Sequence, residues 1–432
     1  MRPLMLAALP LLCVAQPLAA QAVSQRADAV PVIVNRIASS ASFKAAEAKL
    51  AADFDTYVGQ IITITEIPAP PFKEEARGKA FADMLRAAGL KDVTIDEVGN
   101  VIALRPGTDK KLKPVVVSAH LDTVFPEDTP IKVRREGNRL HAPGIGDDSR
   151  GLANLLAYAR ALDAAKIKTK APILFVGTVG EEGQGDLRGV RHLFTKGAYK
   201  DRIGAFFSID GSDPAEITNG GVGSKRYRVT FSGPGGHSFG AFGIVNPMNA
   251  MASAINGLYQ ITPPTDPKTT YSASVTGGGT SVNSIPHDVW VEVDMRSVSA
   301  AELAKLDQQF TAIVTKAVAD ENAERSTKAG VIKADMKVIG ERPAGATPES
   351  AAIVRATAAA IQAKGFAPTF DASSTDSNIP MSLGVPAITM GSGGSGARAH
   401  ALDEYIDVDR ETSLKGMSVG LLALLGVAGV AK

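Results

Sequence analysis

Residues 172–183 read PILFVGTVGEEG, a short apolar run that is followed at once by two adjacent glutamates. The run has the length and composition of a buried β-strand. Two other apolar runs also have a histidine or an acid at their end: one leads into His120, and the other ends on Asp210. Ligands of α/β proteins bind at the carboxyl ends of parallel strands, so these side chains are expected at one edge of a sheet. A polar loop explains one such case, whereas three cases with metal-binding side chains indicate a functional site.

Length and composition describe an ordinary globular protein. The 432 residues are enough for one large domain or two domains of usual size. Of these residues, 45% are hydrophobic and only 5% are aromatic. The 46 basic and 45 acidic residues are mixed along the chain and leave a net charge of +1. This balance argues against a nucleic-acid-binding surface and against a polybasic membrane-binding patch.

The N-terminus has the three parts of a secretory signal peptide. Arg2 supplies the charge, residues 4–15 are apolar, and Ala20-Gln21-Ala22 fits a cleavage site. The apolar run is shorter than the roughly 20 residues of a membrane span. We therefore expect residues 1–22 to be removed, and the mature protein to be periplasmic or secreted without a membrane anchor. The only cysteine, Cys13, would leave with the signal peptide, so that no thiol and no disulfide remain.

The rest of the chain is predicted to be an α/β domain with an insertion. Residues 23–43 have no clear pattern and are interpreted as a tether. After residue 221 the pattern changes to the order βαββαβ, which is typical of ferredoxin-like domains, so residues 222–336 are predicted to be inserted. The α/β domain then comprises residues 44–221 and 337–432. The predicted elements of the insertion are strands at Lys225–Ser232, Thr269–Thr276, Asp288–Arg296 and Val331–Val338, and helices at Pro247–Tyr259 and Ala300–Asn322.

Five side chains are candidate metal ligands: His120, Asp147, Glu182, Asp210 and His400. Two imidazoles and three carboxylates suit Zn²⁺ and similar divalent ions. If two ions share one carboxylate, each ion has three protein ligands and an open position for water. Two ions about 3.5–4 Å apart can activate water and polarise a carbonyl group.

Neighbouring acids have candidate roles beside these ligands. Asp122 lies two residues after the first histidine and can accept its second imidazole N–H. Glu181 is next to a ligand but outside the ligand set, so it can take a proton from water and give it to a leaving amine. Asp148 or Ser149 is expected to cap the following helix, which leaves Asp147 for chemistry. The chain has neither an H-E-x-x-H zinc helix nor a G-x-S-x-G elbow.

Five segments of the chain match the motifs of one family, in that family's order: SAHLDTV (118–124), GIGDD (144–148), GEEG (180–183), SID (208–210) and HALDE (400–404). With these segments the chain resembles the M20 family of dizinc peptidases. That family includes peptidase T, dipeptidases, carnosinases, glutamate carboxypeptidase and succinyl-diaminopimelate desuccinylase. The resemblance implies a catalytic domain with a central mixed sheet flanked by helices, and an inserted ferredoxin-like domain that serves as lid and dimerisation domain.

The resemblance also implies the chemistry of the site. Two Zn²⁺ ions would be bound, with Co²⁺ or Mn²⁺ as substitutes. By resemblance, one ion is held by His120 and Asp210, the other by Glu182 and His400, and both by Asp147. Glu181 would be the general base, and the peptide bond between Asp147 and Asp148 would be cis.

The insertion carries three further segments that match lid motifs of this family: GPGGHS (233–238), VNSIP (282–286) and DMR (294–296). In dimeric members the histidine, here His237, reaches the site of the partner subunit and helps to hold the scissile carbonyl oxygen. Asn283 would contact the substrate, and Arg296 would bind a substrate carboxylate. The simpler alternatives are a solvated turn for His237 and an ion pair with Asp294 for Arg296.

Two departures from the family pattern bear on the substrate. Relatives often carry Gly-Gly-Thr-Asp where this chain has Ser-Ser-Thr-Asp at 373–376. Position 210 is Asp, which within the family goes with aminopeptidases and dipeptidases rather than with carboxypeptidases and deacylases. We predict an exported metallohydrolase of small peptides or other small amides. An N-acyl-amino-acid deacylase or carboxypeptidase on the same metals is one alternative, and a non-catalytic periplasmic binding or scaffold protein that kept the fold is the other.

Overall fold

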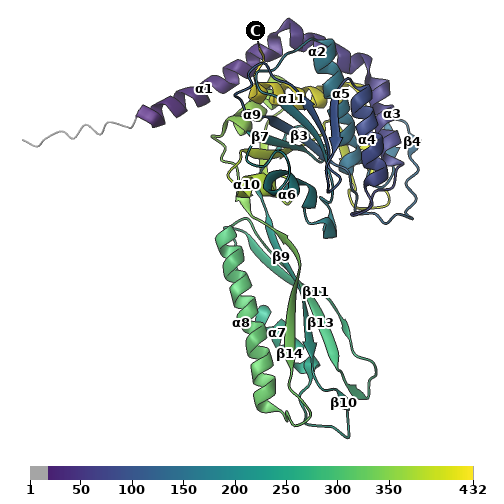
Figure 1. The fold of residues 1–432 in the computed structure, drawn as a ribbon, viewed down its shortest axis with the longest axis vertical. Coiled ribbons are helices and arrows are strands. Elements are labelled where there is room, and N and C mark those ends of the chain that lie inside the picture. The colour runs from purple at the N-terminus through teal and green to yellow at the C-terminus, as the bar shows by residue number, and fades with distance from the viewer. Residues whose placement is uncertain (1–17, 432) are drawn as a thin grey trace, which may run out of the picture.

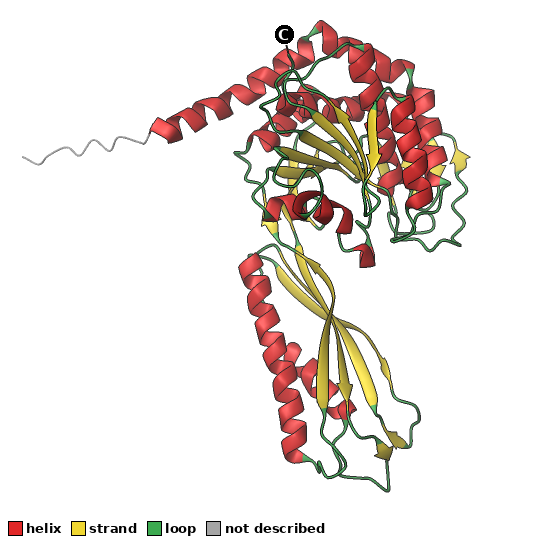
Figure 2. Cartoon of the chain, viewed as in Figure 1, coloured by secondary structure: helices red, strands yellow, loops and turns green. Residues whose placement is uncertain are grey.

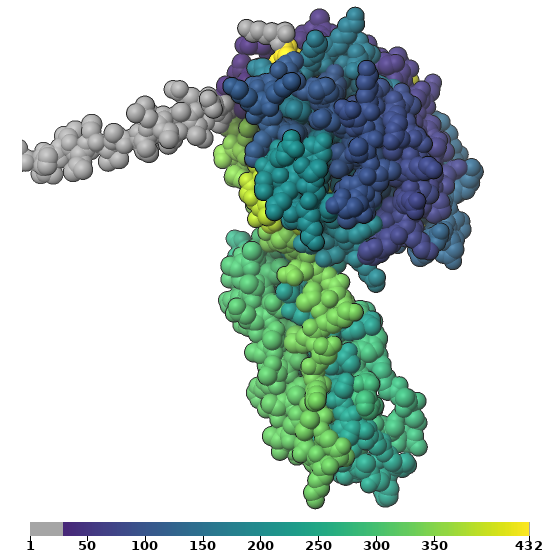
Figure 3. Space-filling view, in the orientation of Figure 1, coloured from purple at the N-terminus to yellow at the C-terminus, as the bar shows by residue number. Residues whose placement is uncertain are grey.

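The computed structural model describes the backbone of residues 18–431 and the side chains of residues 29–431. It shows a rounded body made of helices and a sheet, from which a long arm projects (Figures 1 and 3). The body is the predicted α/β domain, and the arm is the predicted insertion. Most of the predicted signal peptide, residues 1–17, lies outside the described residues.

The body is organised around a mixed sheet, in which parallel strands form the centre. Eight strands follow one another across it, in the order β1 (Asp92–Ile95), β2 (Val101–Arg105), β6 (Ile173–Thr178), β3 (Val115–His120), β7 (Ala205–Ile209), β17 (Ala387–Met390), β8 (Glu216–Gly221) and β15 (Gly345–Ala346). The ninth strand, β16 (Thr369–Ser373), pairs with β8 in parallel. Strands β6, β3, β7 and β17 are parallel neighbours, as their continuous apolar runs predicted.

Both faces of this sheet are covered by helices, because alternate side chains of a strand point to opposite faces. Val115 and Val117 belong to the larger core with α5, whereas Val116 packs on the other side with α6. The described helices of the body are α1 (Leu18–Ser39), α2 (Ala41–Ala52), α3 (Phe54–Thr65), α4 (Glu75–Ala87), α5 (Arg150–Ala164), α6 (Arg188–Thr195), α9 (Ala352–Ala363), α10 (Asn378–Ser382) and α11 (Arg410–Ala428). The predicted fold class, with its central mixed sheet flanked by helices, is therefore confirmed.

The predicted tether at residues 23–43 is wrong. This segment lies mainly in α1, which packs against α9 and α11 at the edge of the body (Figure 1). Val34 and Ile37 are buried in the core, and a Cβ at Gly426 of α11 would meet the Val34 side chain at 2.9 Å. Val34, Ile37 and Phe43 pack into the core whereas Val32 and Ile33 are exposed, so a few apolar residues give order to a segment whose pattern is weak.

Helix α11 is a core helix of the body. It is 19 residues long and apolar enough to cross a membrane by length and composition. However, 67% of its most apolar window is buried inside the molecule, where it packs against α9 and α1. Its hydrophobic surface is therefore used for packing within the protein.

The arm is a four-stranded antiparallel sheet with two helices on one face (Figure 2). Its strands and helices alternate as β9 (Gly223–Ser232), α7 (Pro247–Leu258), β11 (Thr269–Gly278), β13 (Asp288–Ser297), α8 (Ala300–Glu324) and β14 (Lys333–Arg342). The strand order β11-β13-β9-β14 and the chain order βαββαβ confirm the ferredoxin-like prediction. We call this arm the lid. Strand β14 continues to Arg342, past the predicted boundary at residue 336, because it runs on into the body.

Two small sheets complete the fold. At the outer end of the lid, β10 (Gly236–His237) pairs with β12 (Ser284–Ile285). In the body, four short strands lie in the order β18 (Ser395–Ala397), β19 (Tyr405–Asp407), β5 (Arg139–His141) and β4 (Arg134–Glu136). The second sheet joins the loop that carries His400 to the segment that precedes Asp147.

Candidate metal centre

Three parallel strands bring candidate ligands to one edge of the central sheet. Strand β3 lies between β6 and β7 and pairs with both in parallel. It ends at His120, whereas β7 ends directly before Asp210. Strand β6 ends at Thr178, and the turn after it carries the adjacent residues Glu181 and Glu182. This is the arrangement that the three apolar runs predicted.

Asp147 lies between the two candidate histidine ligands. Its Oδ1 is 2.8 Å from His120 Nε2, and its Oδ2 is 2.9 Å from His400 Nε2. The same nitrogen of His400 is 2.9 Å from Glu182 Oε1. One ligand atom each of His120, Asp147 and Glu182 lie within 4.8 Å of one another. Each oxygen of Asp147 thus faces a different imidazole, as a carboxylate shared by two ions would require.

Asp210 adds a third carboxylate to this cluster. It lines a cavity of about 130 Å³ together with Asp147, Gly146, Ser212 and Tyr405. Burial, together with the nearby carboxylate of Asp147, raises the pKa of Asp210 to about 7. The negative charge at this position is therefore unfavourable unless positive charge is close to it.

The chemistry of these donors fits divalent metal ions. His120 Nε2 and Asp147 Oδ1 are buried and face each other at 2.8 Å, yet neither has a hydrogen-bond partner among the described residues. Burial alone would lower the pKa of His120, but the carboxylates of Asp122 and Asp147 raise it well above its usual range. Orphaned donor atoms and an excess of negative charge are what a bound cation would satisfy. Two imidazoles with three carboxylates suit Zn²⁺, Co²⁺ or Mn²⁺.

The orientation of His120 is set by the main chain rather than by the predicted carboxylate. Its Nδ1 is 3.0 Å from the carbonyl oxygen of Asp122, whereas the Asp122 carboxylate is 3.7 Å away. That carboxylate instead accepts the backbone N–H groups of Glu181 and Glu182, at 3.0 and 2.8 Å. Two N–H donors point into this buried place, so the carboxylate turns toward them and holds the glutamate turn.

The loop that carries Asp147 is held by two other acids. Asp148 accepts the backbone N–H of His120 at 3.0 Å and that of Gly151 at 3.2 Å, so it caps α5 as one of the two predicted capping residues. Glu404 is buried and accepts three backbone N–H groups, those of Gly144, Gly146 and Asp147. The peptide bond between Asp147 and Asp148 is cis, as the resemblance implied. Sequence reasoning assigned no role to Glu404, although it lies in a matched motif.

Glu181 has a partner that sequence reasoning missed. Arg342, the last residue of β14, donates from Nη1 to Glu181 Oε1 at 3.1 Å and from Nη2 to the Glu181 carbonyl oxygen at 2.5 Å. Burial raises the pKa of Glu181 well above its usual range, and the Arg342 guanidinium opposes that effect. The two residues are 161 positions apart. The one feature of the sequence that could have indicated their contact is an arginine at the point where the last lid strand returns to the body.

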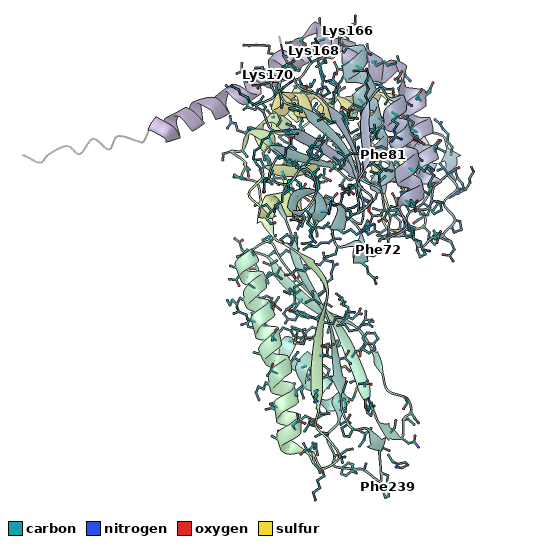
Figure 4. The ribbon with its side chains drawn as sticks, viewed as in Figure 1. Phe72, Phe81, Lys166, Lys168, Lys170 and Phe239 are labelled. Atoms are coloured by element: carbon teal, nitrogen blue, oxygen red, sulfur yellow. The ribbon has the colours of Figure 1, made fainter. Side chains whose placement is uncertain are left out.

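The lid residues are not brought to the metal cluster within one chain. His237 and Asn283 lie together at the outer end of the lid, where the Ser238 N–H donates to the Asn283 carbonyl oxygen. Figure 4 shows the neighbouring Phe239 at the tip farthest from the body. Arg296 lies near the end of the lid that adjoins the body. Its guanidinium forms an ion pair with the Asp294 carboxylate at 2.7 Å, which is the simpler of the two roles considered for it.

His237 has an imidazole that is exposed and fixed in orientation. Its Nδ1 accepts the backbone N–H groups of Phe239 and Gly240 at 3.2 and 3.3 Å. In the neutral ring the proton is therefore on Nε2. This N–H faces away from the loop and is available to a group outside the turn.

Comparisons with known proteins agree with this geometry. The sequence model of peptidase family M20/M25/M40 matches residues 116–424, well over half of the chain. A protein of Thermococcus kodakarensis, named as a LysW-lysine/LysW-ornithine hydrolase, is 31% identical over 120 residues. That stretch is 28% of this chain and spans only 31% of the relative's length.

Two solved structures share the fold. Aminopeptidase PepT from Bacillus cereus superposes with a TM-score of 0.71 and 20% identity, covering 87% of this chain and 99% of its own. The YXEP protein of Bacillus subtilis, described as a dinuclear metal binding peptidase of the M20 family, has a TM-score of 0.64 and 17% identity. It covers 88% of this chain and 99% of its own.

The two adjacent glutamates should respond differently to removal. Glu182→Ala is expected to lose a metal ion, because Glu182 lies within the ligand cluster. Glu181→Ala should keep both ions, because its carboxylate contacts Arg342 instead. Metal content per chain, measured by mass spectrometry after loading with Zn²⁺, checks this, with the exposed Glu349→Ala as the matched control. Equal zinc loss in both site variants would contradict the assignment.

Proposed function

Because the chain belongs to peptidase family M20/M25/M40, we propose that it is an exported two-metal hydrolase that cleaves the peptide bond of di- or tripeptides. The family consists of hydrolases that act on peptides and amides. The observation that carries the proposal is the position of Asp147, whose two oxygens face His120 and His400 at 2.8 and 2.9 Å. Glu181 lies beside this cluster with a carboxylate that is not part of it.

In the proposed metal site, His120 and Asp210 would hold one ion, Glu182 and His400 would hold the other, and Asp147 would serve both. Zn²⁺ is the proposed metal, with Co²⁺ or Mn²⁺ as substitutes. When bound, the two ions supply Lewis acidity and lower the pKa of water. The support on the protein side is the set of donor atoms: one ligand atom each of His120, Asp147 and Glu182 lie within 4.8 Å of one another, and the first two are buried without a hydrogen-bond partner among the described residues.

The proton transfers are assigned to Glu181. As general base it would take the proton of the attacking water, and as general acid it would give that proton to the amine that leaves. Its position next to Glu182 supports this role, and Arg342 holds the carboxylate in one orientation. Asp122 and Glu404 take no part in the chemistry, because each holds the main chain of a ligand loop through its N–H groups.

The preference for small peptides rests on three points. Asp at position 210 accompanies aminopeptidases and dipeptidases in the family that the motifs resemble. PepT, which shares the fold, is an aminopeptidase by description. The cavity beside Asp147 and Asp210 has about 130 Å³, which suits a small group. The second candidate is an N-acyl-amino-acid deacylase or carboxypeptidase, which the Thermococcus kodakarensis relative favours because its name describes hydrolysis of lysine and ornithine conjugates.

A substrate panel tests the proposed function. Zinc-loaded protein is expected to hydrolyse dipeptides and tripeptides with a free N-terminus, and to be much slower with N-acyl amino acids. Glu181→Gln should lower kcat by at least about 10²-fold, because the amide cannot accept the proton. Glu349→Gln, an exposed control, should leave kcat unchanged. Faster release of amino acids from N-acyl substrates would favour the second candidate and contradict the first.

We further propose that the active unit is a dimer formed through the lids. Strand β11 is at the edge of the lid sheet, where a second copy can add its own strand. His237 lies two residues before Phe239, which is at the tip of the lid farthest from the body (Figure 4). Its Nδ1 accepts two backbone N–H groups, which leaves the proton of the neutral ring on Nε2 as a donor. Across the dimer it would hold the oxyanion that forms when water attacks. Asn283, beside it, would contact the substrate, whereas Arg296 would bind a substrate carboxylate once the lid closes.

Mixing of inactive variants tests the contribution of His237. Removing one oxyanion donor costs about 10²–10³ in kcat, so His237→Ala alone should be nearly inactive while it keeps its metals. Glu181→Ala should also be inactive. When the two variants exchange subunits, some dimers have one site with both groups intact, and activity should partly return. No recovery after verified exchange would mean that His237 does not act across a dimer.

Export is the remaining part of the proposal. The charged start, the short apolar run and Ala20-Gln21-Ala22 support cleavage after Ala22. The mature chain is then expected to begin at Val23 and to be found in the periplasm or the medium. N-terminal sequencing of protein from fractionated cells of a secretion-competent bacterium checks this. A cytoplasmic chain that still begins with Met1 would contradict it.

A further inference from the structure

The lid is joined to the body by two antiparallel connections that lie side by side at the junction of lid and body (Figures 1 and 2). One connection leads from β8 through Val222 into β9, and the other leads from β14 through Pro343 and Ala344 into β15. They are in contact at this junction, since a Cβ on Gly223 would meet the Ala344 nitrogen at 2.6 Å. Any movement of the lid relative to the body must pass through these two connections.

Arg342 lies at this junction, and the body holds its main chain on both sides. On one side, Asp186 accepts the Glu341 N–H at 3.0 and 3.1 Å, and Arg191 donates to the Glu341 carbonyl oxygen at 2.7 Å. On the other side, the amide of Asn378 donates to the Pro343 carbonyl oxygen at 2.9 Å. The backbone of the arginine is therefore fixed before and after its own position.

Asn378 also ties the second connection to the first. It is fully buried, and its Nδ2 donates to the Val222 carbonyl oxygen at 2.8 Å as well as to that of Pro343. Its Oδ1 accepts the Thr375 N–H at 2.9 Å. One amide group thus joins both lid connections to the segment 374–378, at the junction of lid and body.

Asp186 and Asn378, which hold the main chain around Arg342, come from segments next to the candidate active site. Asp186 follows Glu182 by four residues, and Asn378 follows Ser374 by four. Ser374 accepts a hydrogen bond from Arg342 at 3.2 Å, so it lies against the same guanidinium that contacts Glu181. The contacts form a continuous path from the lid connections through Arg342 to the carboxylate of Glu181.

We propose that Asp186 and Asn378 are positioning residues that hold Arg342 against Glu181, and so tie the orientation of this carboxylate to the position of the lid. The inference rests on the proposed role of Glu181 as the proton carrier. A catalytic group must be held within about 0.5 Å and 10–20° of its productive geometry. Asp186 and Asn378 touch neither the cluster nor the cavity beside it, so their effect passes through Arg342.

The kinetic test is a double-mutant cycle. Asn378→Asp keeps the shape of the side chain but removes both N–H donors, and Asp186→Asn weakens the acceptor for the Glu341 N–H. Each is expected to lower kcat about 10–100-fold with KM changed less than about threefold. In an Arg342→Ala background, the same changes should lower kcat no further than about twofold, because the residue through which they act is absent.

Asn322 offers a matched control within the lid. Its Nδ2 donates to the Ile332 carbonyl oxygen at 3.1 Å and its Oδ1 accepts the Ile332 N–H at 2.8 Å, so it too joins main-chain groups. Asn322→Asp should cost comparable stability, measured as Tm, but should change kcat less than about twofold. Equal losses of kcat in Asn322→Asp and Asn378→Asp, or full additivity with Arg342→Ala, would overturn the proposal.

A distance measurement tests the same proposal without any substrate. Because Cys13 is the only cysteine, Cys13→Ser gives a thiol-free background. Spin labels at two exposed positions, Lys110→Cys in the body and Lys328→Cys in the lid, report their separation by pulsed electron resonance in samples diluted with unlabelled protein. Asn378→Asp and Asp186→Asn should broaden the distance distribution, whereas Asn322→Asp should not.

The two readouts separate the proposal from the proposed function. If the parent protein hydrolyses no member of the substrate panel, the proposed function fails, and the distance distributions alone decide whether these residues hold the lid. If the distance distributions remain as narrow in Asn378→Asp and Asp186→Asn as in the parent protein, these two residues do not hold the lid, and the proposed positioning role is wrong.

Discussion

The structure depends on the mutual repulsion of three carboxylates that lie near one another in a largely buried site. Two unit charges of the same sign 4 Å apart repel by about 4 kcal/mol at an effective dielectric constant of about 20. Burial, together with the charges of Asp147 and Glu182 that act on Asp210 in the same way, raises the pKa of Asp210 to about 7. Two imidazoles offset part of this charge. Divalent cations would offset the rest, and for this reason we regard metal binding as the purpose of the arrangement.

Much of the surrounding structure holds the ligand loops in place by means of other carboxylates. Asp122, Asp148 and Glu404 are buried, and each accepts two or three backbone N–H groups from a loop that carries a candidate ligand. Charge-assisted hydrogen bonds of this kind are stronger than neutral ones, so they can fix loops that the sheet alone does not order. The site therefore contains two groups of acids, those that face the cation positions and those that face the main chain. Arg342 adds the lid to this scheme, because it reaches Glu181 from the last lid strand.

The parts of the fold and site that could be predicted are those that depend on short, continuous stretches of sequence. Continuous apolar runs marked the parallel strands, and the polar residues after them marked the edge at which His120, Glu182 and Asp210 meet. The βαββαβ order gave the lid, since each of its elements has its own periodicity. The prediction that Asp147 lies between the other ligands came from the resemblance to a family, because no periodicity in the sequence indicates it.

The parts that could not be predicted depend on contacts between distant segments. Arg342 and Glu181 are 161 residues apart, and nothing near either residue indicates the other. The Asp122 carboxylate was expected on the imidazole, but two N–H groups of the glutamate turn attract it more strongly than one ring nitrogen. The few apolar positions of residues 23–43 predict a tether, although those few suffice for packing once α9 and α11 provide a surface.

The most direct test of the central claim is a crystal structure of the zinc-loaded protein, with anomalous scattering measured on both sides of the zinc absorption edge. The account predicts two zinc peaks about 3.5–4 Å apart, one on each side of the Asp147 carboxylate, with His120 bound to one ion and His400 to the other. A single peak, or two peaks that do not share Asp147, would contradict it.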